Sequence, residues 1–264
     1  MAKPSRAIAD KKPTPTALSS RALAQLSREI KERALFSART TEMRYVAAMQ
    51  DVLDALTSGD IGEAEARKRL MTVLDGFGYT PEGGFPDVGG GGAAPNTIQD
   101  LSSYGRINLI LDTNEGMAAS VSRLAEENTD TLDLFPAWRF VRFMNPNGEP
   151  RDWAVRWAAA GESVGWQGAL RDEFVARKDS PIWQALGDGA GGFDDTLGNP
   201  YPPFAFNSGM GWMDVDRDEA IELGLDLSSP VEIRPPSLAV RDDERERARA
   251  HYGDEFLESL FDPD

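Results

Sequence analysis

Residues 135–144 read FPAWRFVRFM, and this stretch decides the fold class of the chain. Its aromatic and β-branched side chains alternate, which predicts a strand, and the NPNG run at 145–148 predicts a turn directly after it. Helical periodicity dominates before this stretch, whereas short mixed elements and loops follow it. The sequence therefore predicts an α+β protein, in which an N-terminal helical half precedes a small mixed α/β C-terminal domain with long loops and a terminal helix.

Four amphipathic helices are predicted before the strand, at residues 21–37, 40–57, 61–76 and 104–127. The fourth is the most regular, because Ile107, Leu111 and Ala118 recur on one face. Asn114, next to Thr113, falls in this apolar seam, where a polar side chain often fixes the register or hydrogen-bonds a neighbouring segment. The polar pair is therefore a candidate structural contact.

Residues 80–95, TPEGGFPDVGGGGAAP, separate the third helix from the fourth and hold four consecutive glycines. A phosphate-binding loop would need Gly-Lys-Ser/Thr after the glycines and an apolar strand before them, and this sequence has neither. The composition instead predicts a flexible loop.

Short elements are predicted after the strand, namely helices at about 151–160, 216–223 and 241–261, a loop at 187–203, a short strand around Val215 and extended chain at 230–240. Trp153 and Trp157 stand one turn apart in the first of these helices. Asp216 is the expected N-cap of the second helix, with Glu219 three residues later as in a capping box, and Gly224 is its expected end.

Composition shifts divide the chain into a flexible basic arm (1–18), a helical domain (19–128), a compact α+β domain (132–235) and an acidic C-terminal helix or tail (236–264). The formal net charge is −16. Ten basic and four acidic residues give +6 over residues 1–50, and 18 basic and 40 acidic residues give −22 over the remainder. So acidic a chain is not expected to coat duplex DNA, and any nucleic-acid contact is expected through the basic arm alone.

The residue inventory argues against several chemistries. The chain has no cysteine, so a disulfide, a thiolate metal site and a cysteine nucleophile cannot form. A Ser-His-Asp triad would have to use His251, which lies in a charged stretch typical of a solvated helix. We therefore expect no cofactor, no metal and no catalytic centre. The N-terminus lacks a signal-peptide core and no apolar run approaches the roughly 18 residues of a membrane span, so a soluble cytoplasmic protein is expected.

Two patterns that suggest chemistry are incomplete. Asp214–Asp218 begins like a calcium-binding loop, but Glu219 stands where that loop needs glycine and Leu225 where it needs glutamate. Gly161–Gly165 has the spacing of a nucleophile elbow but lacks the apolar strand that precedes one. Neither pattern predicts a site.

Two side-chain pairings are also weak candidates. A serine–lysine dyad would combine Ser163 or Ser208 with Lys178, which has no anchoring motif around it. Asp194 and Asp195 would suit acid–base work with a further carboxylate, but nothing distinguishes them among 44 acidic residues.

The least ordinary segments are SPIWQAL at 180–186 and NPYPPFAFNSGM at 199–210. Prolines fix φ in the second, and one residue separates Phe204 from Phe206. Asn207 and Ser208 follow with short side chains that hydrogen-bond to nearby backbone. This composition predicts a rigid loop anchored by aromatic rings, and we expect both phenylalanines to be buried in their own domain.

In their order, these segments resemble the C-terminal half of the phage Mu F-like minor head proteins, also called phage head morphogenesis proteins. The similar run comprises Arg151–Trp153, Asp179–Trp183, Tyr201–Phe204, Asn207–Met210, Asp214-Val215 and Glu222–Leu225. Upstream, Arg106–Asn114 is similar to an arginine-plus-apolar helix of that family, and the resemblance covers about residues 28–226. The residues that carry it are Arg106, Thr113, Asn114, Trp153, Trp183, Pro202, Pro203, Phe204, Phe206, Asn207 and Ser208.

The resemblance implies a structural protein of the virion head, present in the host cytoplasm during assembly. It implies an oligomeric assembly with the portal protein, the major capsid protein or both, and a role in head assembly, DNA packaging or DNA delivery. The family's usual histidine and Cys-Arg-Cys turn are absent, because Asn207–Met210 occupies the place of that turn. No metal role therefore carries over.

The expected C-terminal helix offers a candidate partner contact, the apolar cluster Phe256, Leu257, Leu260 and Phe261. Such a cluster fits a groove on a partner, and it fits packing on its own domain equally well. Two other functions stay open, a capsid-maturation hydrolase and a nucleic-acid-binding module that acts through the basic arm. The sequence favours the structural, non-enzymatic role.

Overall fold

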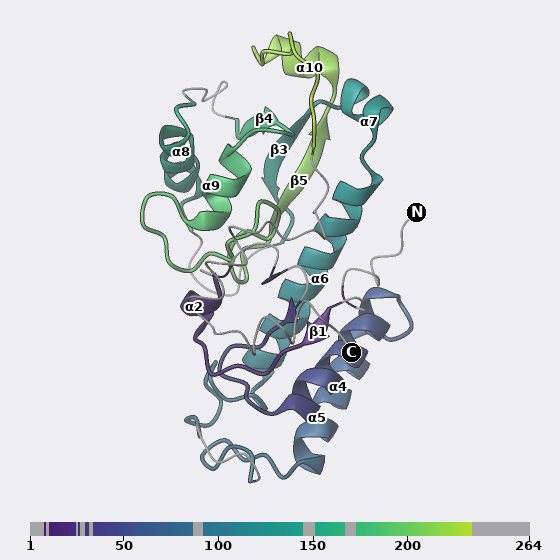
Figure 1. The fold of residues 1–264 in the computed structure, drawn as a ribbon, viewed down its shortest axis with the longest axis vertical. Helices are drawn as coiled ribbons and strands as arrows, with labels where there is room; N and C mark the ends of the chain where they lie inside the picture. The colour runs from purple at the N-terminus through teal and green to yellow at the C-terminus, as the bar shows by residue number, and fades with distance from the viewer. Residues whose placement is uncertain are drawn as a thin grey trace. The chain divides into compact units, whose positions relative to one another are not determined.

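The computed structural model describes residues 8, 11–24, 26, 30–31, 34–86, 92–144, 151–166 and 173–233 (Figure 1). The chain divides into two compact units. One is built from residues within Ala2–Ala119 and is called the helical unit below, and the other is Ser120–Pro235 and is called the sheet unit. The predicted fold class is confirmed, because helices precede a small antiparallel sheet with its own helices.

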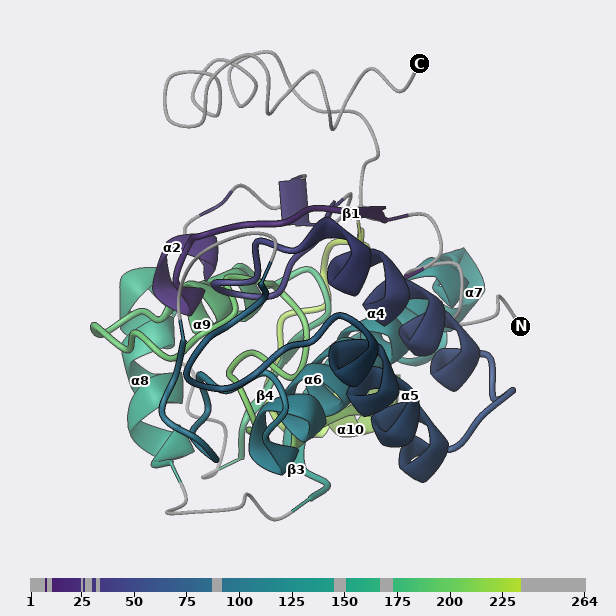
Figure 2. The ribbon, with the colours of Figure 1, turned by 90° about the horizontal axis from the view of Figure 1, so that it is seen from below.

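Three helices form the core of the helical unit: α4 (Met43–Thr57), α5 (Glu63–Gly76) and the first part of α6 (Tyr104–Glu126). α4 and α5 lie side by side in both views (Figures 1 and 2), joined by a turn in which Gly59 adopts a φ of 80°. Their apolar stripes meet in one cluster, which includes Tyr45, Met49, Leu53, Leu70, Ile107 and Leu111. The predicted helices at 40–57, 61–76 and 104–127 are confirmed.

The segment at the N-terminus packs against the helical unit. β1 (Lys12–Pro13) pairs in parallel with β2 (Ala34–Leu35), and the Thr14 amide donates to the Leu35 carbonyl over 2.9 Å. Ile8 is buried in the same apolar cluster as α4 and α5. Residues 11–18 are therefore not the flexible arm that composition predicts, because backbone pairing and one inserted apolar side chain hold them. Residues 1–7 lie outside the described residues.

The predicted helix at 21–37 is wrong over most of its length. α2 ends after one turn (Ser20–Ala24), Leu26 lies in a bend, and residues 34–35 form β2. Leu26, Ile30 and Ala34 are all buried, so the apolar spacing that suggested a helix reflects burial. Pairing with β1 determines the conformation here and overrides the local preference.

The glycine-rich segment is packed where it is described. Phe85 is buried, and its ring centroid lies 5.0 Å from that of Tyr79 and 6.0 Å from that of Tyr45. Thr80 and Gly84 form an isolated antiparallel bridge, and the Ala93 amide donates to the Pro81 carbonyl over 2.5 Å. The prediction of a flexible loop over all of 80–95 is therefore wrong at its two ends. Asp87, Val88 and three of the four consecutive glycines fall at 87–91, outside the described residues.

An antiparallel sheet in the order β4-β3-β5 forms the centre of the sheet unit. β3 (Ala137–Arg142) is the predicted strand and pairs with β4 (Val175–Arg177) on one side and β5 (Met210–Val215) on the other. Trp138 lies opposite Ala176 and Asp214, and Phe140 lies opposite Trp212. Because side chains alternate along a strand, these residues share one face of the sheet, and Ala137, Val175 and Val215 share the other.

Helices pack on both faces of this sheet. Trp183 of α9 (Ile182–Asp188) contacts the face that carries Trp138 and Phe140, beside α8 (Trp153–Ser163). Ala220 of α10 (Arg217–Glu222) packs against the opposite face. α8 and α10 confirm the predicted helices, and each begins at an aspartate whose carboxylate accepts a backbone N–H, Asp152 from Val155 and Asp216 from Glu219. The sequence did not predict β4, α9 or α7 (Thr129–Leu134).

The division between the units falls within α6, between Ala119 and Ser120, and not after residue 128 as the composition suggests. Among the described residues, no helix is long and apolar enough to cross a membrane. The predicted helix at 241–261, with His251 and the cluster Phe256, Leu257, Leu260 and Phe261, lies outside the described residues. The turn at 145–148 also lies outside them, as does most of the extended chain at 230–240.

Candidate functional site

A cluster of aromatic rings fills the face of the sheet under α8 and α9. Trp138 of β3 and Trp212 of β5 stack with ring centroids 3.7 Å apart. Trp183 of α9 meets Trp138 edge-on at 5.9 Å, and Phe204 meets Phe140 edge-on at 5.4 Å. Edge-on pairs at these distances are a favoured arrangement of aromatic rings, so they add to the free energy of burying them.

The cluster continues into α8, where Trp153 and Trp157 are buried and lie 5.0 and 6.1 Å from the ring of Phe140. The indole N–H groups of both, like those of Trp138 and Trp212, meet no hydrogen-bond acceptor among the described residues. Trp183 differs, because its Nε1 donates to the Arg177 carbonyl over 2.9 Å. The cluster is therefore held together chiefly by apolar contact.

The Pro-Pro-Phe loop closes this cluster. The Pro202–Pro203 bond is cis, Pro202 is buried, and Phe204 is fully buried at a φ of 60°. The Ser208 hydroxyl, also buried, donates to the Pro203 carbonyl and accepts from the Met210 amide over 3.2 Å. The rigid aromatic-anchored loop is therefore confirmed.

Phe206 corrects the expectation that both phenylalanines are buried. Its side chain is only half-buried, as is that of Asn207, whose φ of 51° is also positive. Strand-like alternation would put Phe204 and Phe206 on one side, but the positive φ values of Phe204 and Asn207 turn the chain here and break that pattern. Gly209 follows with a φ of 63°, and a Cβ there would lie 2.1 Å from the Met144 carbonyl oxygen.

Two arginines hold the outward part of this loop. Arg151 donates to the backbone carbonyls of Phe206 (2.6 Å) and Asn207 (3.3 Å). The Asp195 carboxylate accepts hydrogen bonds from both arginines. Its Oδ2 lies 2.5 Å from Nε of Arg151, and its Oδ1 lies 2.8 Å from Nη1 of Arg156. Burial alone raises the pKa of Asp195, but hydrogen bonds from Arg156 and Arg151 outweigh it and lower the pKa below its ordinary value. Asp195 thus partners arginines and not a second carboxylate.

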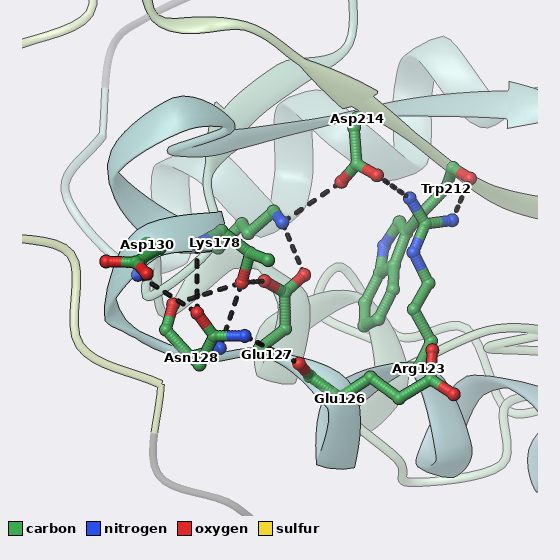
Figure 3. A network of polar contacts seen from close by, with 9 residues as sticks. Arg123, Glu126, Glu127, Asn128, Asp130, Lys178, Trp212 and Asp214 are labelled. Atoms are coloured by element: carbon green, nitrogen blue, oxygen red, sulfur yellow. Dashed lines mark hydrogen bonds and ion pairs between the residues drawn. The ribbon is translucent and has the colours of Figure 1, made fainter. Parts of the chain in front are cut away.

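Lys178 is the centre of a second polar group (Figure 3). It follows β4, its amide donates to the Pro136 carbonyl, and its side chain is 1% exposed. The ammonium contacts Glu127 Oε1, lies 3.0 Å from Asp214 Oδ1 and sits 5.2 Å from the ring centroid of Trp138. A buried cation is stable only where such partners replace water.

Glu127 is held in place by contacts at the N-terminus of α7. Asn128 is the N-cap of α7, and its Oδ1 accepts from the amides of Asp130 and Thr131. The Thr131 hydroxyl in turn lies 2.9 Å from Glu127 Oε2, to which it donates. Glu127 Oε2 therefore faces Thr131. Its Oε1 faces Lys178 (Figure 3).

Asp214 is positioned by β5 and by the end of α6. Arg123 Nη2 lies 2.6 Å from Asp214 Oδ2, and Arg123 Nη1 donates to the Trp212 carbonyl over 2.7 Å. Asp214 thus has one oxygen on Arg123 and the other on Lys178, as Figure 3 shows. The carboxylate of Asp214, the first residue of the apparent calcium motif, thus binds two cationic side chains of the chain itself.

The opposite face of the sheet carries a separate ion-pair group. Arg139 Nη2 lies 2.7 Å from Glu219 of α10 and 2.5 Å from Glu173. Hydrogen bonding to Glu219, followed by Glu173, raises the pKa of Arg139 above its ordinary value. Glu219 therefore uses its carboxylate to dock α10 on the sheet, while Asp216 alone caps the helix by a side-chain contact.

The remaining family-motif residues lie on α6 in the helical unit. Arg106 is buried, and its Nη2 donates to Ser37 Oγ (2.8 Å) and to the Ala38 carbonyl (2.9 Å). Asn114 donates to the Ile110 carbonyl of its own helix over 2.8 Å and not to a neighbouring segment. The buried Thr113 hydroxyl meets no partner among the described residues. Only Arg106 of the three therefore links distant parts of the chain.

The candidate nucleophiles are engaged in structural hydrogen bonds. Ser163 lies at the end of α8 and donates to the Ala160 carbonyl over 2.8 Å, so Gly161–Gly165 is a helix end and not a strand-to-helix elbow. Ser208 donates to Pro203, and Lys178 faces Glu127 and Asp214. No cluster of three metal-ligand side chains occurs within the described part of the chain.

Comparisons with family models, with curated proteins and with solved structures find no match for this chain.

Proposed function

We propose that this chain is a structural minor head protein of a tailed bacteriophage, associating with the portal or major capsid protein during head assembly, DNA packaging or DNA delivery. The observation that carries the proposal is the order of motifs from Arg106 to Leu225, which resembles that of the Mu F-like minor head proteins. The order of the motifs is more specific than any single one of them.

The geometry of the sheet unit supports this proposal. Trp153, Trp183 and Phe204, which the resemblance groups across more than 50 residues of sequence, all contact Phe140. Arg151, the first residue of the similar run, holds the carbonyls of Phe206 and Asn207. The motifs from Arg151 onward thus lie together in the sheet unit, where they build a scaffold and not a reaction centre.

The alternative of a capsid-maturation hydrolase receives less support. A serine nucleophile needs a base within hydrogen-bond reach. The hydroxyls of Ser163 and Ser208 instead donate to backbone carbonyls, and the Lys178 ammonium faces two carboxylates. These contacts give neither serine a base and favour structural hydrogen bonding for both.

The proposal is tested by co-expressing the full chain with the portal protein of the same phage and capturing either partner at low salt. We expect the two to co-purify after nuclease treatment, which removes any tether of DNA. Removing residues 254–264 should weaken capture if the C-terminal apolar cluster makes the contact. A loss of capture on nuclease treatment would favour the nucleic-acid alternative.

Two results would contradict the proposal. One is failure to co-purify with portal, capsid and scaffold proteins alike under these conditions. The other is a hydrolytic turnover that a single substitution, such as Ser208→Ala, abolishes in a variant that keeps its fold.

A further inference from the structure

A lysine just after one outer strand of the sheet and an aspartate on the other outer strand point at each other. Lys178 directly follows β4 and Asp214 lies on β5, so the two residues flank β3 from opposite sides. Both belong to the face that carries Trp138, and Nζ of Lys178 lies 3.0 Å from Oδ1 of Asp214 (Figure 3). The side chain of Lys178 is 1% exposed, so protein groups and not water surround its amine.

We propose that the folded chain joins these two side chains by an amide bond between Nζ of Lys178 and Cγ of Asp214. This is a modification that the protein performs on itself once, and it does not depend on which particle the protein belongs to. It would close a covalent bridge across β3 between two strands that pair with each other nowhere in the described sheet.

The reaction needs no co-reactant. Nζ gives up protons and forms a bond to Cγ, one carboxylate oxygen of Asp214 leaves with two protons as water, and the other becomes the amide oxygen. An ammonium and a carboxylate are thereby converted to a neutral amide and one water, with no change in oxidation state. Asp214 is 38% exposed, so the water has a path out of the site.

Glu127 is placed to carry the protons. Its Oε1 contacts Lys178 Nζ, and its Oε2 is fixed by the Thr131 hydroxyl at 2.9 Å. A carboxylate in that place can take a proton from the amine and return it to the departing oxygen of Asp214. General acid–base help of this kind contributes about 10²–10⁴-fold to a rate.

Arg123 is placed to stabilise the negative charge that forms on attack. Its Nη2 lies 2.6 Å from Asp214 Oδ2, the oxygen that does not face Lys178. Attack at Cγ puts negative charge on that oxygen, and a fixed cation there lowers the barrier. The same contact directs the outcome, because Oδ2 is retained as the amide oxygen while Oδ1 leaves.

The proximity of the two side chains also raises the rate of the reaction. Two groups held in reactive geometry behave as if at an effective concentration of about 10⁵–10⁸ M. The strands fix Asp214, and the Pro136 carbonyl fixes the backbone of Lys178. Asp214 is the acceptor in preference to Glu127, because Arg123 activates only Asp214 among the two carboxylates on Nζ.

The test is the intact mass of the purified full chain, measured after denaturation. We expect the folded and aged wild type to be lighter than its sequence by one water, and a peptide map to show the segments containing Lys178 and Asp214 joined. A full sequence mass in folded wild type overturns the proposal without any variant. Water loss at an Asp-Gly pair such as Asp188-Gly189 leaves these segments separate, and that result also overturns it.

Variants test the assigned roles. Lys178→Arg and Asp214→Ala should keep the full mass, whereas the matched control Lys68→Arg, at an exposed helix position, should still lose one water. Glu127→Gln should slow the loss by about 10²–10⁴-fold. An unchanged rate in Glu127→Gln would overturn its role as proton carrier, and a map joining Lys178 to Glu127 would overturn the choice of Asp214.

Discussion

Replacing Phe204 by alanine tests whether the Pro-Pro-Phe loop is anchored by its aromatic ring. Phe204 is fully buried, and its ring lies 5.4 Å from Phe140, 6.0 Å from Trp212 and 6.1 Å from Trp183. Truncating a buried phenylalanine costs about 3–5 kcal/mol. Phenylalanine and alanine both carry a Cβ and therefore bear the same backbone cost at the positive φ of this position. The loss of stability thus reports on packing and not on backbone strain.

Intrinsic fluorescence is a suitable assay, because all six tryptophans lie in the sheet unit. With a urea m-value of about 2 kcal/mol/M, a loss of about 4 kcal/mol lowers the unfolding midpoint by roughly 2 M. Phe206→Ala is the matched control in the same loop. Its half-buried ring should cost only about 1 kcal/mol, roughly half the free energy of burying a phenylalanine completely.

Equal midpoints for wild type and Phe204→Ala would refute this reasoning. A larger loss of stability in Phe206→Ala than in Phe204→Ala would refute it too, because the ring of Phe206 would then be the anchor of the loop.

Two further substitutions test the polar contacts. Asp195→Asn should cost about 1 kcal/mol at neutral pH, allowing for solvent screening of a partly exposed carboxylate. Because Arg156 and Arg151 lower the folded pKa of Asp195, its stabilisation is present above the ordinary value of 3.8 and is lost as the pH falls through the folded pKa. The difference between wild type and variant in tryptophan-detected unfolding should therefore shrink in acid, and a constant difference would contradict this. Arg106→Met should cost about 2–3 kcal/mol in the helical unit by circular dichroism, because Ser37 loses a charged donor, and an unchanged stability would argue against that contact.

Local signals predicted the elements whose determinants are local. β3 was recognisable because aromatic and β-branched residues alternate around Trp138 and Phe140, and α10 because Asp216 precedes a helical pattern that ends at Gly224. The amphipathic stripes of α4, α5 and α6 predicted these helices for the same reason. Each of these segments contains its own signal within one or two turns of chain.

Segments defined by distant pairing could not be predicted in this way. Ala34–Leu35 is a strand only because Lys12–Pro13 lies beside it, and its helical spacing is otherwise convincing. β4 has three residues, too few for alternation to be visible. Ile8 is one apolar residue in a polar segment, and no composition rule marks it as part of the core.

The candidate site was predictable in its aromatic part and not in its ionic part. The spacing of Phe204 and Trp183 within unusual proline-rich segments drew attention to them, and both are buried. Glu127 and Lys178 are 51 residues apart and carry no motif, so only the fold brings them together. Asp195 was one acidic residue among 44, and its arginine partners stand 39 and 44 positions away.

Mass photometry of purified portal rings mixed with this protein tests the central claim most directly. If the chain is a minor head protein that docks on the portal, the ring should gain mass in whole multiples of the mass of this chain, saturating at a fixed number of copies. A ring mass that does not change at micromolar concentrations of folded protein, with major capsid protein equally unaffected, would contradict the claim.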